Sequence, residues 1–388
     1  MSSQSVPPVG VEPGGGSELR SRTGEFVLGG KGLPLLSPTR IYTCGITPYD
    51  VTHLGHAATF VWADVLSAVV TLAGAKPVAA RNVTDVDDVL TVAAATRGRD
   101  YDEFALVQEF LFDRDMTALR VTPPAHAPRA RHHVPDVQRM AVALLANGRA
   151  YERAGHVFFR GSDVPARCGI DTATARTLVA EQGDDPDDPL RNDPFDVPVW
   201  RPSREEEPGW PSPWGRGRPG WHAECAAMAL AVHGPVVDVV VGGADLVFPH
   251  HAYQAAMAEA ATGAGPFARG SLHVGSVHRD GQKMAKSTGN LTLVADLLAD
   301  HSAAAVRLLL LDRRYDADWE YHESGLATAG HRLERLYAAA GRPSRSASAR
   351  AKVGTALLTD LDVPAALDVA EESGGEAARW LLATLMLG

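Results

Sequence analysis

The chain has 388 residues, of which 45% are hydrophobic and 22% charged, a balance typical of a globular protein with two or three domains. The formal net charge of −10 argues against a large nucleic-acid-binding surface, which needs clustered lysine and arginine. Three cysteines, no apolar run of roughly 18 residues and no signal-peptide pattern lead us to expect a reducing, cytoplasmic location without membrane association.

The predicted elements begin with a tail over 1–25, which is rich in Ser, Pro and Gly and is expected to be disordered. A β-rich alternation over 40–46, helical periodicity over 53–74 and a second strand starting at 76 form the strand–helix–strand unit that builds parallel sheets. Helices are then expected over 101–120 and 135–148, a short strand over 156–161 and irregular functional loops over 162–220.

The second half of the chain returns to regular structure. The pattern predicts a helix over 221–234, a buried strand running into a loop over 237–251, a strand over 269–277 and a helix over 292–312. The remaining residues are expected to form a small helical bundle. The sequence therefore predicts an α/β protein, with a catalytic domain over 26–300, an insertion at about 100–200 and a C-terminal helical bundle over 301–388.

The stretch CGITPYDVTHLGHA at 44–57 places His53 and His56 where the first strand gives way to the first helix. A helix N-terminus presents free backbone N–H groups and a positive dipole end, so it favours anions, and imidazoles there can donate to phosphate oxygens. The alternative is that both histidines only cap the helix. Two histidines at this spacing supply too few ligands for a metal site of their own.

A second stretch, DGQKMAKSTGN at 280–290, carries Lys283 and Lys286 in a glycine-flanked loop. Two such lysines can neutralise a polyphosphate as it becomes a leaving group, although a loop of this kind alone is more often only solvated. HLGH and KMAKS together resemble the HIGH and KMSKS motifs of the class I aminoacyl-tRNA synthetase superfamily. That resemblance implies a Rossmann-like parallel-sheet core that binds ATP, with Mg²⁺, and activates an amino acid as its adenylate.

Cysteine and histidine residues indicate which amino acid is activated. Cys44 lies just before the HLGH helix, Cys225 ends the stretch GRPGWHAEC, and His250 and His251 end GGADLVFPHH, each at an expected edge of the sheet. Two thiolates and one imidazole give Zn²⁺ three ligands and leave its fourth tetrahedral position open, where a substrate thiol binds better than a hydroxyl. The alternative is that the cysteines are small buried hydrophobic residues. Cys168 has no such context.

These stretches, with NVTDVDD at 82–88, resemble the cysteinyl-tRNA synthetase family and, more closely, its tRNA-independent relatives, the cysteine ligases of mycothiol biosynthesis. EQGDDP at 181–186 and SPWGRGRPGW at 212–221 are similar to the ligases' forms of these segments, and we find no anticodon-binding region. The resemblance implies ATP-dependent joining of L-cysteine, through cysteinyl-AMP, to an amino-sugar acceptor, the amine of glucosaminyl-inositol.

The resemblance also implies the site residues. One zinc ion per chain is held by Cys44, Cys225 and His250, because Gln254 stands where the synthetases have a fourth, glutamate ligand. The residues expected to act on the phosphates are His53, His56, Lys283 and Lys286. Those expected to contact cysteine or the adenylate are Cys44, Gly45, Ile46, Thr47, Thr59, Asn82, Val83, Thr84, Trp221, Gly243, Ala244, Asp245 and Val277.

Other functions stay open from the sequence alone. A paralogous ligase would acylate a different amine in specialised metabolism, and a cysteinyl-tRNA synthetase would charge tRNA, a poor partner for so acidic a chain. A non-catalytic zinc- or nucleotide-binding regulator would not need the clamp lysines and both histidines. The general base is open too: Asp85, Asp87, Asp88 and His53 are candidates, although carboxylates of TDVDD can instead cap the following helix.

Overall fold

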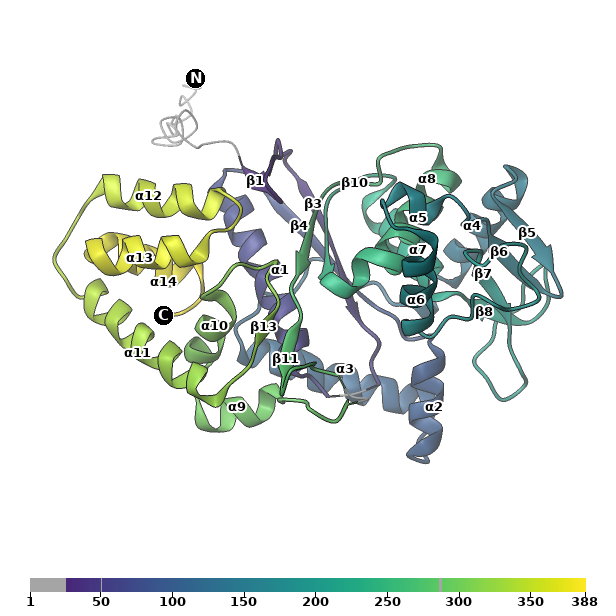
Figure 1. Cartoon of the computed structure of the whole chain (residues 1–388), viewed down its shortest axis with the longest axis horizontal. Helices are drawn as coiled ribbons and strands as arrows, with labels where there is room; N and C mark the ends of the chain where they lie inside the picture. The colour runs from purple at the N-terminus through teal and green to yellow at the C-terminus, as the bar shows by residue number, and fades with distance from the viewer. Residues whose placement is uncertain (1–25, 50, 286–287) are drawn as a thin grey trace, which may run out of the picture.

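The molecule is built around a parallel β-sheet. In a computed structural model, which describes residues 26–49, 51–285 and 288–388, four strands lie in the order β10–β9–β3–β4 (Figure 1). They are β3 (Thr39–Ile46), β4 (Pro77–Val83), β9 (Val237–Gly243) and β10 (Ala268–Val274), and all neighbouring pairs are parallel. Since β4 lies on one side of β3 and β9 on the other, the strand order reverses there. The predicted α/β class is confirmed.

Alternating side chains bury both faces of this sheet. Ile41 and Val239 belong to the core formed with α1 (Leu54–Leu72), whereas Tyr42 and Val240 belong to the core formed with α7 (Trp221–His233) and α8 (Ala252–Thr262). Burial on both faces is typical of a parallel sheet with helical crossovers. Because α1 follows β3 directly, its N-terminus lies at the carboxyl edge of the sheet.

Helix α1 is long and apolar enough to cross a membrane, with a mean hydropathy of 1.3 over an 18-residue window. The structure places it in the core, because its apolar side chains from Leu54 to Val70 are buried and the helix contacts β9, β10 and β4. The core helix of a globular protein passes the same hydropathy test. These contacts assign α1 to the protein interior.

A second, antiparallel sheet lies between β4 and β9 in the chain (Figure 1). Its strands are β5 (Ala150–Arg153), β6 (His156–Phe159), β7 (Val197–Pro202) and β8 (Gly217–Pro219), and it packs against α4 (Val134–Ala146). The segment 162–220 also holds α5 (Val164–Arg167) and α6 (Thr172–Glu181), so the prediction of irregular structure there is wrong for these elements. Prolines weaken the strand signal of β7, and its pairing with β6 is a tertiary effect. We propose that the insertion extends to Pro219.

Further helices and short strands surround the two sheets. They are β1 (Val27–Leu28), β2 (Lys31–Gly32), α2 (Asp88–Thr96), α3 (Tyr101–Ala118), η1 (Ala130–His132), η2 (Ala244–Leu246), η3 (Val247–His251), β11 (Val277–Arg279), β12 (Gln282–Lys283) and β13 (Trp319–Glu320). β11 pairs with both β12 and β13.

The C-terminal part is helical (Figure 1). Its helices are α9 (Val294–Asp300), α10 (Ala303–Leu311), α11 (Glu323–Ala340), α12 (Ala347–Leu358), α13 (Val363–Ser373) and α14 (Gly375–Thr384). The single helix predicted over 292–312 is two helices, because the Ser302 hydroxyl accepts the Ala305 N–H at 3.2 Å and starts α10 as its N-cap. We propose a domain limit near residue 300, since α10 packs against α1 on one side and α11 on the other.

One buried arginine ties this bundle to the core. The Arg307 guanidinium is fully buried and donates to the carbonyls of Leu385 at 3.0 Å and Leu119 at 2.9 Å, and to Asp64 Oδ2 of α1 at 2.8 Å. These contacts join α10, α1, the end of α3 and the C-terminus. Removing one partner of a buried ion pair is strongly destabilising, because the other charge is left buried without compensation.

Replacing Arg307 by methionine is therefore expected to lower the free energy of unfolding by about 3–5 kcal/mol, because Asp64 and the carbonyls lose their donor. Urea denaturation measures this loss. The matched control is Arg314→Met, since Arg314 is exposed and its ion pairs with Asp316 and Asp360 contribute about 1 kcal/mol or less. Equal effects of the two substitutions would contradict the anchoring role of Arg307.

Candidate active site

A cleft of about 310 Å³ lies at the carboxyl edge of the parallel sheet. Residues at or just beyond the carboxyl end of each of the four strands line it: Cys44, Gly45 and Thr47 at β3, Asn82 and Thr84 at β4, Gly243 and Asp245 at β9, and 274–277 at β10. In open α/β sheets, ligands bind at this edge where the strand order reverses, here between β3 and β9. A larger cavity of about 600 Å³ lies between α1, β4 and α14 and is away from these strand ends.

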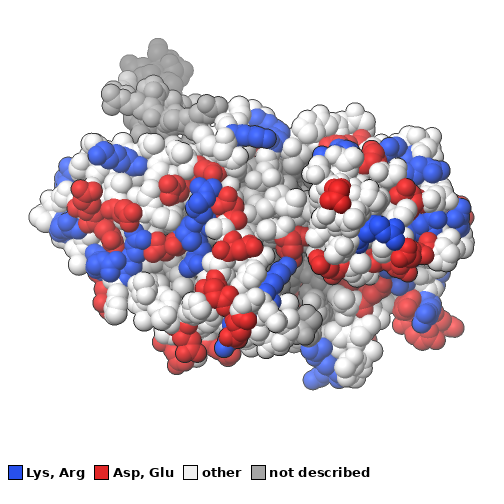
Figure 2. Space-filling view, viewed as in Figure 1, with Lys and Arg blue, Asp and Glu red and all other residues white. Residues whose placement is uncertain are grey.

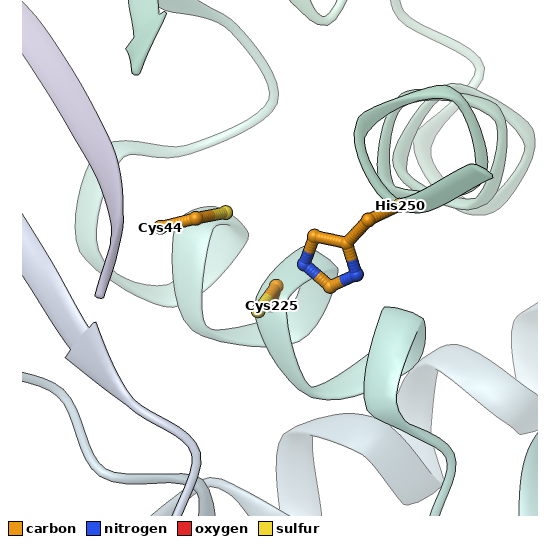
Figure 3. A group of neighbouring side chains, drawn as sticks. All are labelled: Cys44, Cys225 and His250. Atoms are coloured by element: carbon orange, nitrogen blue, oxygen red, sulfur yellow. The ribbon is translucent and has the colours of Figure 1, made fainter. Parts of the chain in front are cut away.

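Three potential metal ligands meet at one end of the cleft. The Cys44 and Cys225 sulfurs and a ring nitrogen of His250 lie within 4.8 Å of one another, and all three residues are buried. Cys44 lies in β3, two residues before its end, Cys225 follows Trp221 by one turn of α7, and His250 comes from the kinked turn η3 (Figure 3). The sticks point toward a common space, so three elements far apart in sequence supply one donor each.

Glycine makes the approach of β3 to β4 possible at this point. The register of the two strands shifts between Thr43 and Ile46, and the Gly45 N–H donates to Asn82 Oδ1 at 2.8 Å. A Cβ at Gly45 would lie 1.8 Å from the Asn82 carbonyl oxygen, so no other residue fits without moving the strand. The contact fixes Asn82 beside the potential metal ligands.

Polar groups surround the three ligands. Asn82 Nδ2 donates to Cys225 Sγ at 3.3 Å, and Gln254, fully buried, places Oε1 at 3.8 Å from Cys44 Sγ. The Nδ1 atoms of His222 and His250 lie 2.9 Å apart, which leaves Nε2 of His250 for a metal. Such partners orient the ligands of metal sites. Gln254 offers a neutral amide where a carboxylate would be a stronger zinc ligand.

Burial acts on the protonation of both the thiol and the imidazole. A hydrogen bond with Cys44, and then burial, raises the pKa of the Cys225 thiol well above its ordinary value, so a metal would have to displace the thiol proton on binding. Burial, assisted by His222 and His251, lowers the pKa of His250 well below its ordinary value, so its imidazole is neutral as a metal ligand must be. Two thiols and a neutral imidazole in a dry pocket are a donor set that suits Zn²⁺.

The same cleft is also lined by the groups expected to meet phosphates. His53 is the N-cap of α1, and its Nδ1 accepts the Gly55 N–H at 3.1 Å. The bond leaves the proton on Nε2, from which the ring can donate. The His56 ring stacks on His53 with centroids 3.8 Å apart, and the Lys283 ammonium lies 2.8 Å from Asp245 Oδ2. His53 can therefore cap the helix through Nδ1 and donate to an anion through Nε2 at the same time.

His53 is also a source of acid sensitivity. Burial, and then the neighbouring His56 and Lys283, lowers the pKa of His53 to about 3. Between this value and the ordinary value near 6.5, the unfolded chain binds a proton that the folded protein does not, so stability rises with pH through that window. Lowering the pH from 7 to 5 should therefore cost the wild type about 2 kcal/mol more than His53→Asn. Urea unfolding at the two pH values checks this, and an equal loss in both proteins would contradict it.

The structure brings most of the predicted contact residues into the cleft. Its lining includes Cys44, Gly45, Thr47, Thr59, Asn82, Thr84, Trp221, Gly243, Asp245 and Val277, together with His53, His56, Lys283 and the ligands Cys225 and His250. Ile46, Val83 and Ala244 are neighbours of lining residues but do not line it themselves. Lys286 lies outside the described residues.

The candidate bases are mostly engaged elsewhere. Asp87 caps α2 through the Val89 N–H, as the alternative interpretation of TDVDD expects, and Asp88 pairs with Arg201 and Arg218. Asp85 is fully buried and forms an ion pair with Arg131 at 2.8 Å. The unprotonated nitrogen of His53 is taken by Gly55.

Sequence reasoning missed the groups that act on the ligands rather than on the substrate. Asn82 was expected only as an adenylate contact, and His222 was not considered. No sequence spacing indicates these roles, because Asn82 and His222 each contact a residue on a different element, Cys225 and His250 respectively. The only signal for His222 was its position inside the stretch GRPGWHAEC, three residues before Cys225.

Comparison with known proteins first defines the class. Residues 36–331 match the family described as tRNA synthetases class I (C) catalytic domain. Among solved structures, the chain is similar to Mycobacterium tuberculosis methionyl-tRNA synthetase in complex with methionyl-adenylate, with a TM-score of 0.64 and 17% identity, over 87% of this chain and 82% of that one. At this identity the likeness concerns the fold alone. The fold is that of class I synthetase catalytic domains.

Curated relatives identify the family within this class of proteins. The chain is 45% identical to the L-cysteine:1D-myo-inositol 2-amino-2-deoxy-alpha-D-glucopyranoside ligase of Thermomonospora curvata, over 84% of this chain and 81% of that protein. It is 41% identical to the protein of the same name from Thermobispora bispora, over 95% of this chain and 92% of that protein. The chain belongs to this ligase family, as the sequence motifs predicted.

Proposed function

We propose that this protein is an ATP-dependent, AMP-forming ligase that joins L-cysteine, through cysteinyl-AMP, to the amine of glucosaminyl-inositol in mycothiol biosynthesis. One observation carries the proposal: a thiol-selective donor set and a group of phosphate-facing side chains share one cleft at the carboxyl edge of the sheet. The name of the curated relatives supports cysteine and the amino sugar as the substrates.

The metal end of the cleft selects cysteine. Cys44, Cys225 and His250 would hold Zn²⁺, which when bound supplies a position for the substrate thiol and lowers its pKa. The Asn82 amide donates to the Cys225 sulfur and offsets its charge as a thiolate. Trp221 stacks on His250 with ring centroids 4.1 Å apart and walls this end of the cleft. Serine offers a less acidic, harder oxygen, so it is rejected without a separate editing site.

The other end of the cleft handles ATP, which we expect to bind with Mg²⁺. The substrate carboxylate attacks the α-phosphorus, a P–O bond forms, and the bond to pyrophosphate breaks with its electron pair on the leaving oxygen. Lys283 exchanges Asp245 for the phosphates and neutralises this charge, while His53 donates from Nε2 at the start of α1. We assign the same role to His56 and, from the motif alone, to Lys286.

The second step forms the amide. The acceptor amine attacks the carbonyl carbon of cysteinyl-AMP, a C–N bond forms, and the C–O bond to AMP breaks. No covalent bond to the enzyme is needed. Because the candidate aspartates are held by a helix cap or by arginines, we assign no general base among them. With its thiol at the metal ligands and its carboxylate at the phosphates, cysteine would place its carbonyl between the two groups of side chains, where the acceptor amine would have to reach it.

The charge distribution bears on the choice between a sugar and tRNA as acceptor. On the face drawn in Figure 2, Lys and Arg side chains of the described residues are interspersed with Asp and Glu and do not gather into one basic surface. A tRNA needs a continuous positive surface, whereas a small amino sugar does not. We therefore favour the amino sugar as the acceptor. From the sequence-based expectation of a reducing environment, we also propose that the reaction takes place in the cytoplasm.

The test is cysteine-dependent exchange of pyrophosphate into ATP. Cysteine is expected to support exchange and serine is expected to support less than about 1% of that rate, because only a thiol fits the metal position. A non-catalytic regulator would show no exchange with either amino acid. Equal exchange with both would contradict selection by the donor set.

A further inference from the structure

The loop that carries the clamp lysine is built around one side chain, Asn290. It begins with the hairpin of β11 and β12, in which His278 pairs with Lys283 and Arg279 pairs with Gln282. The two turn residues, Asp280 and Gly281, have φ values of 57° and 73°, the left-handed pair of a tight two-residue hairpin. Lys283 is thus held on a strand, but β12 ends immediately after it.

Beyond the end of β12, the side chain of Asn290 bonds the backbone of the loop. Its Oδ1 accepts the Ala285 N–H at 3.0 Å and the Thr288 hydroxyl at 2.6 Å. Its Nδ2 faces the carbonyls of Arg279 at 3.1 Å, Gln282 at 3.3 Å and Lys283 at 3.3 Å, so the amide links both strands of the hairpin to the far side of the loop. A single amide thus joins backbone groups of both hairpin strands to the Ala285 N–H beyond them.

The bonded carbonyl of Lys283 belongs to the residue whose ammonium faces the cleft. The Lys283 ammonium lies 2.8 Å from Asp245, at the end of β9, and Ala285 and Met284 also line the cleft. Because Asn290 bonds the backbone of both Lys283 and Ala285, it fixes where the lysine side chain starts. Asn290 itself does not line the cleft, so any effect on the reaction must pass through these neighbours.

We propose that Asn290 is a positioning residue for adenylate formation: its bonds to the backbone of Lys283 and Ala285 hold Lys283 so that it meets the phosphates of ATP. The proposal rests on the function proposed above. Loss of the amide leaves Lys283 on a strand end with free carbonyls, and a displacement of about 1 Å in a catalytic group can lower a rate by about 10²-fold. The cysteine-binding end of the cleft is built from other elements and is not touched by Asn290.

The test is a double-mutant cycle of Asn290→Ala and Lys283→Ala in cysteine-dependent ATP–pyrophosphate exchange. N290A alone is expected to lower kcat by about 10- to 100-fold, with the KM for cysteine within about twofold of wild type. In the K283A background, N290A should lower the rate by no more than about threefold, because the residue through which it acts is gone. Asn147→Ala is the matched control, since this amide bonds backbone groups through both its oxygen and its nitrogen, as Asn290 does, but lies in the insertion; we expect no change.

A merely structural role predicts a different pattern. If N290A lowered the rate equally in both backgrounds, or raised the KM for cysteine and lowered zinc content in parallel, the positioning role would be overturned. An unchanged kcat would overturn it as well. Should N290A fail to fold, N290D carries the same cycle, because it keeps the acceptor oxygen and turns a carboxylate toward the three carbonyls. Absence of exchange in the wild type would instead count against the proposed function.

Discussion

Cys225→Ser is expected to lower cysteine-dependent ATP–pyrophosphate exchange by about 10³-fold or more and to remove most of the bound zinc. The serine hydroxyl is nearly isosteric with the thiol, but it does not ionise under conditions in which a metal-bound thiol does. The pocket is fully buried, and the Asn82 donor is poised for a thiolate, so no solvent ligand replaces the lost sulfur without rearrangement. Exchange kinetics and a colorimetric zinc assay after chelator competition measure both losses.

The control for this substitution is Cys168→Ser. Cys168 is exposed and lies at the end of α5, outside the cleft, so both the exchange rate and the zinc content should stay at wild-type values. If Cys225→Ser exchanged pyrophosphate as fast as the wild type, the donor set would have no part in cysteine activation.

The second large effect is expected at the phosphate end. Lys283→Ala should lower the kcat of exchange by about 10²- to 10³-fold, with little change in the KM for cysteine, because the lysine neutralises charge that develops on the leaving pyrophosphate. Its ammonium is held by Asp245 at the cleft, at a distance from the thiol-binding end. The separation of kcat from KM distinguishes this role from a contribution to substrate binding.

Lys76→Ala is the control for the lysine substitution. Lys76 is exposed and immediately precedes β4, so it lies at the amino edge of the sheet, opposite the cleft. Its loss should leave both kinetic constants unchanged. A comparable decrease for Lys76→Ala and Lys283→Ala would mean that net charge, and not position, governs the rate.

The fold was largely predictable because its central elements carry strong local signals. The alternation of β3, the periodicity of α1 and the glycine that ends α7 were each enough to place an element, and their order indicated a parallel sheet. The break between α9 and α10 followed a known rule, since Ser302 is a good N-cap, but a long apolar run hid it. The insertion was not predictable in detail, because β7 and β8 are short and are defined by their partners.

The residues of the candidate site were also predictable only in part. Cys44, Cys225 and His250 were found because their residue types and the surrounding motifs indicate metal chemistry, and the structure places their donor atoms together. Asn82 and Asn290 act through hydrogen bonds to a ligand and to loop carbonyls, which leave no periodicity or spacing in the sequence. Arg307 is similar, because nothing in a leucine-rich helix indicates that its arginine faces inward. Such contacts depend on tertiary geometry, which the sequence encodes only through the whole fold.

The central claim is that cysteine activation and acceptor-amine capture occur in one cleft. Its most direct test is mass spectrometry of the products formed when the purified protein, with zinc, receives L-cysteine, MgATP and glucosaminyl-inositol. We predict one cysteinyl amide of the amino sugar for each AMP and pyrophosphate released, and no product when serine replaces cysteine. Formation of AMP and pyrophosphate without this amide, or transfer of cysteine to tRNA in its place, would contradict the account.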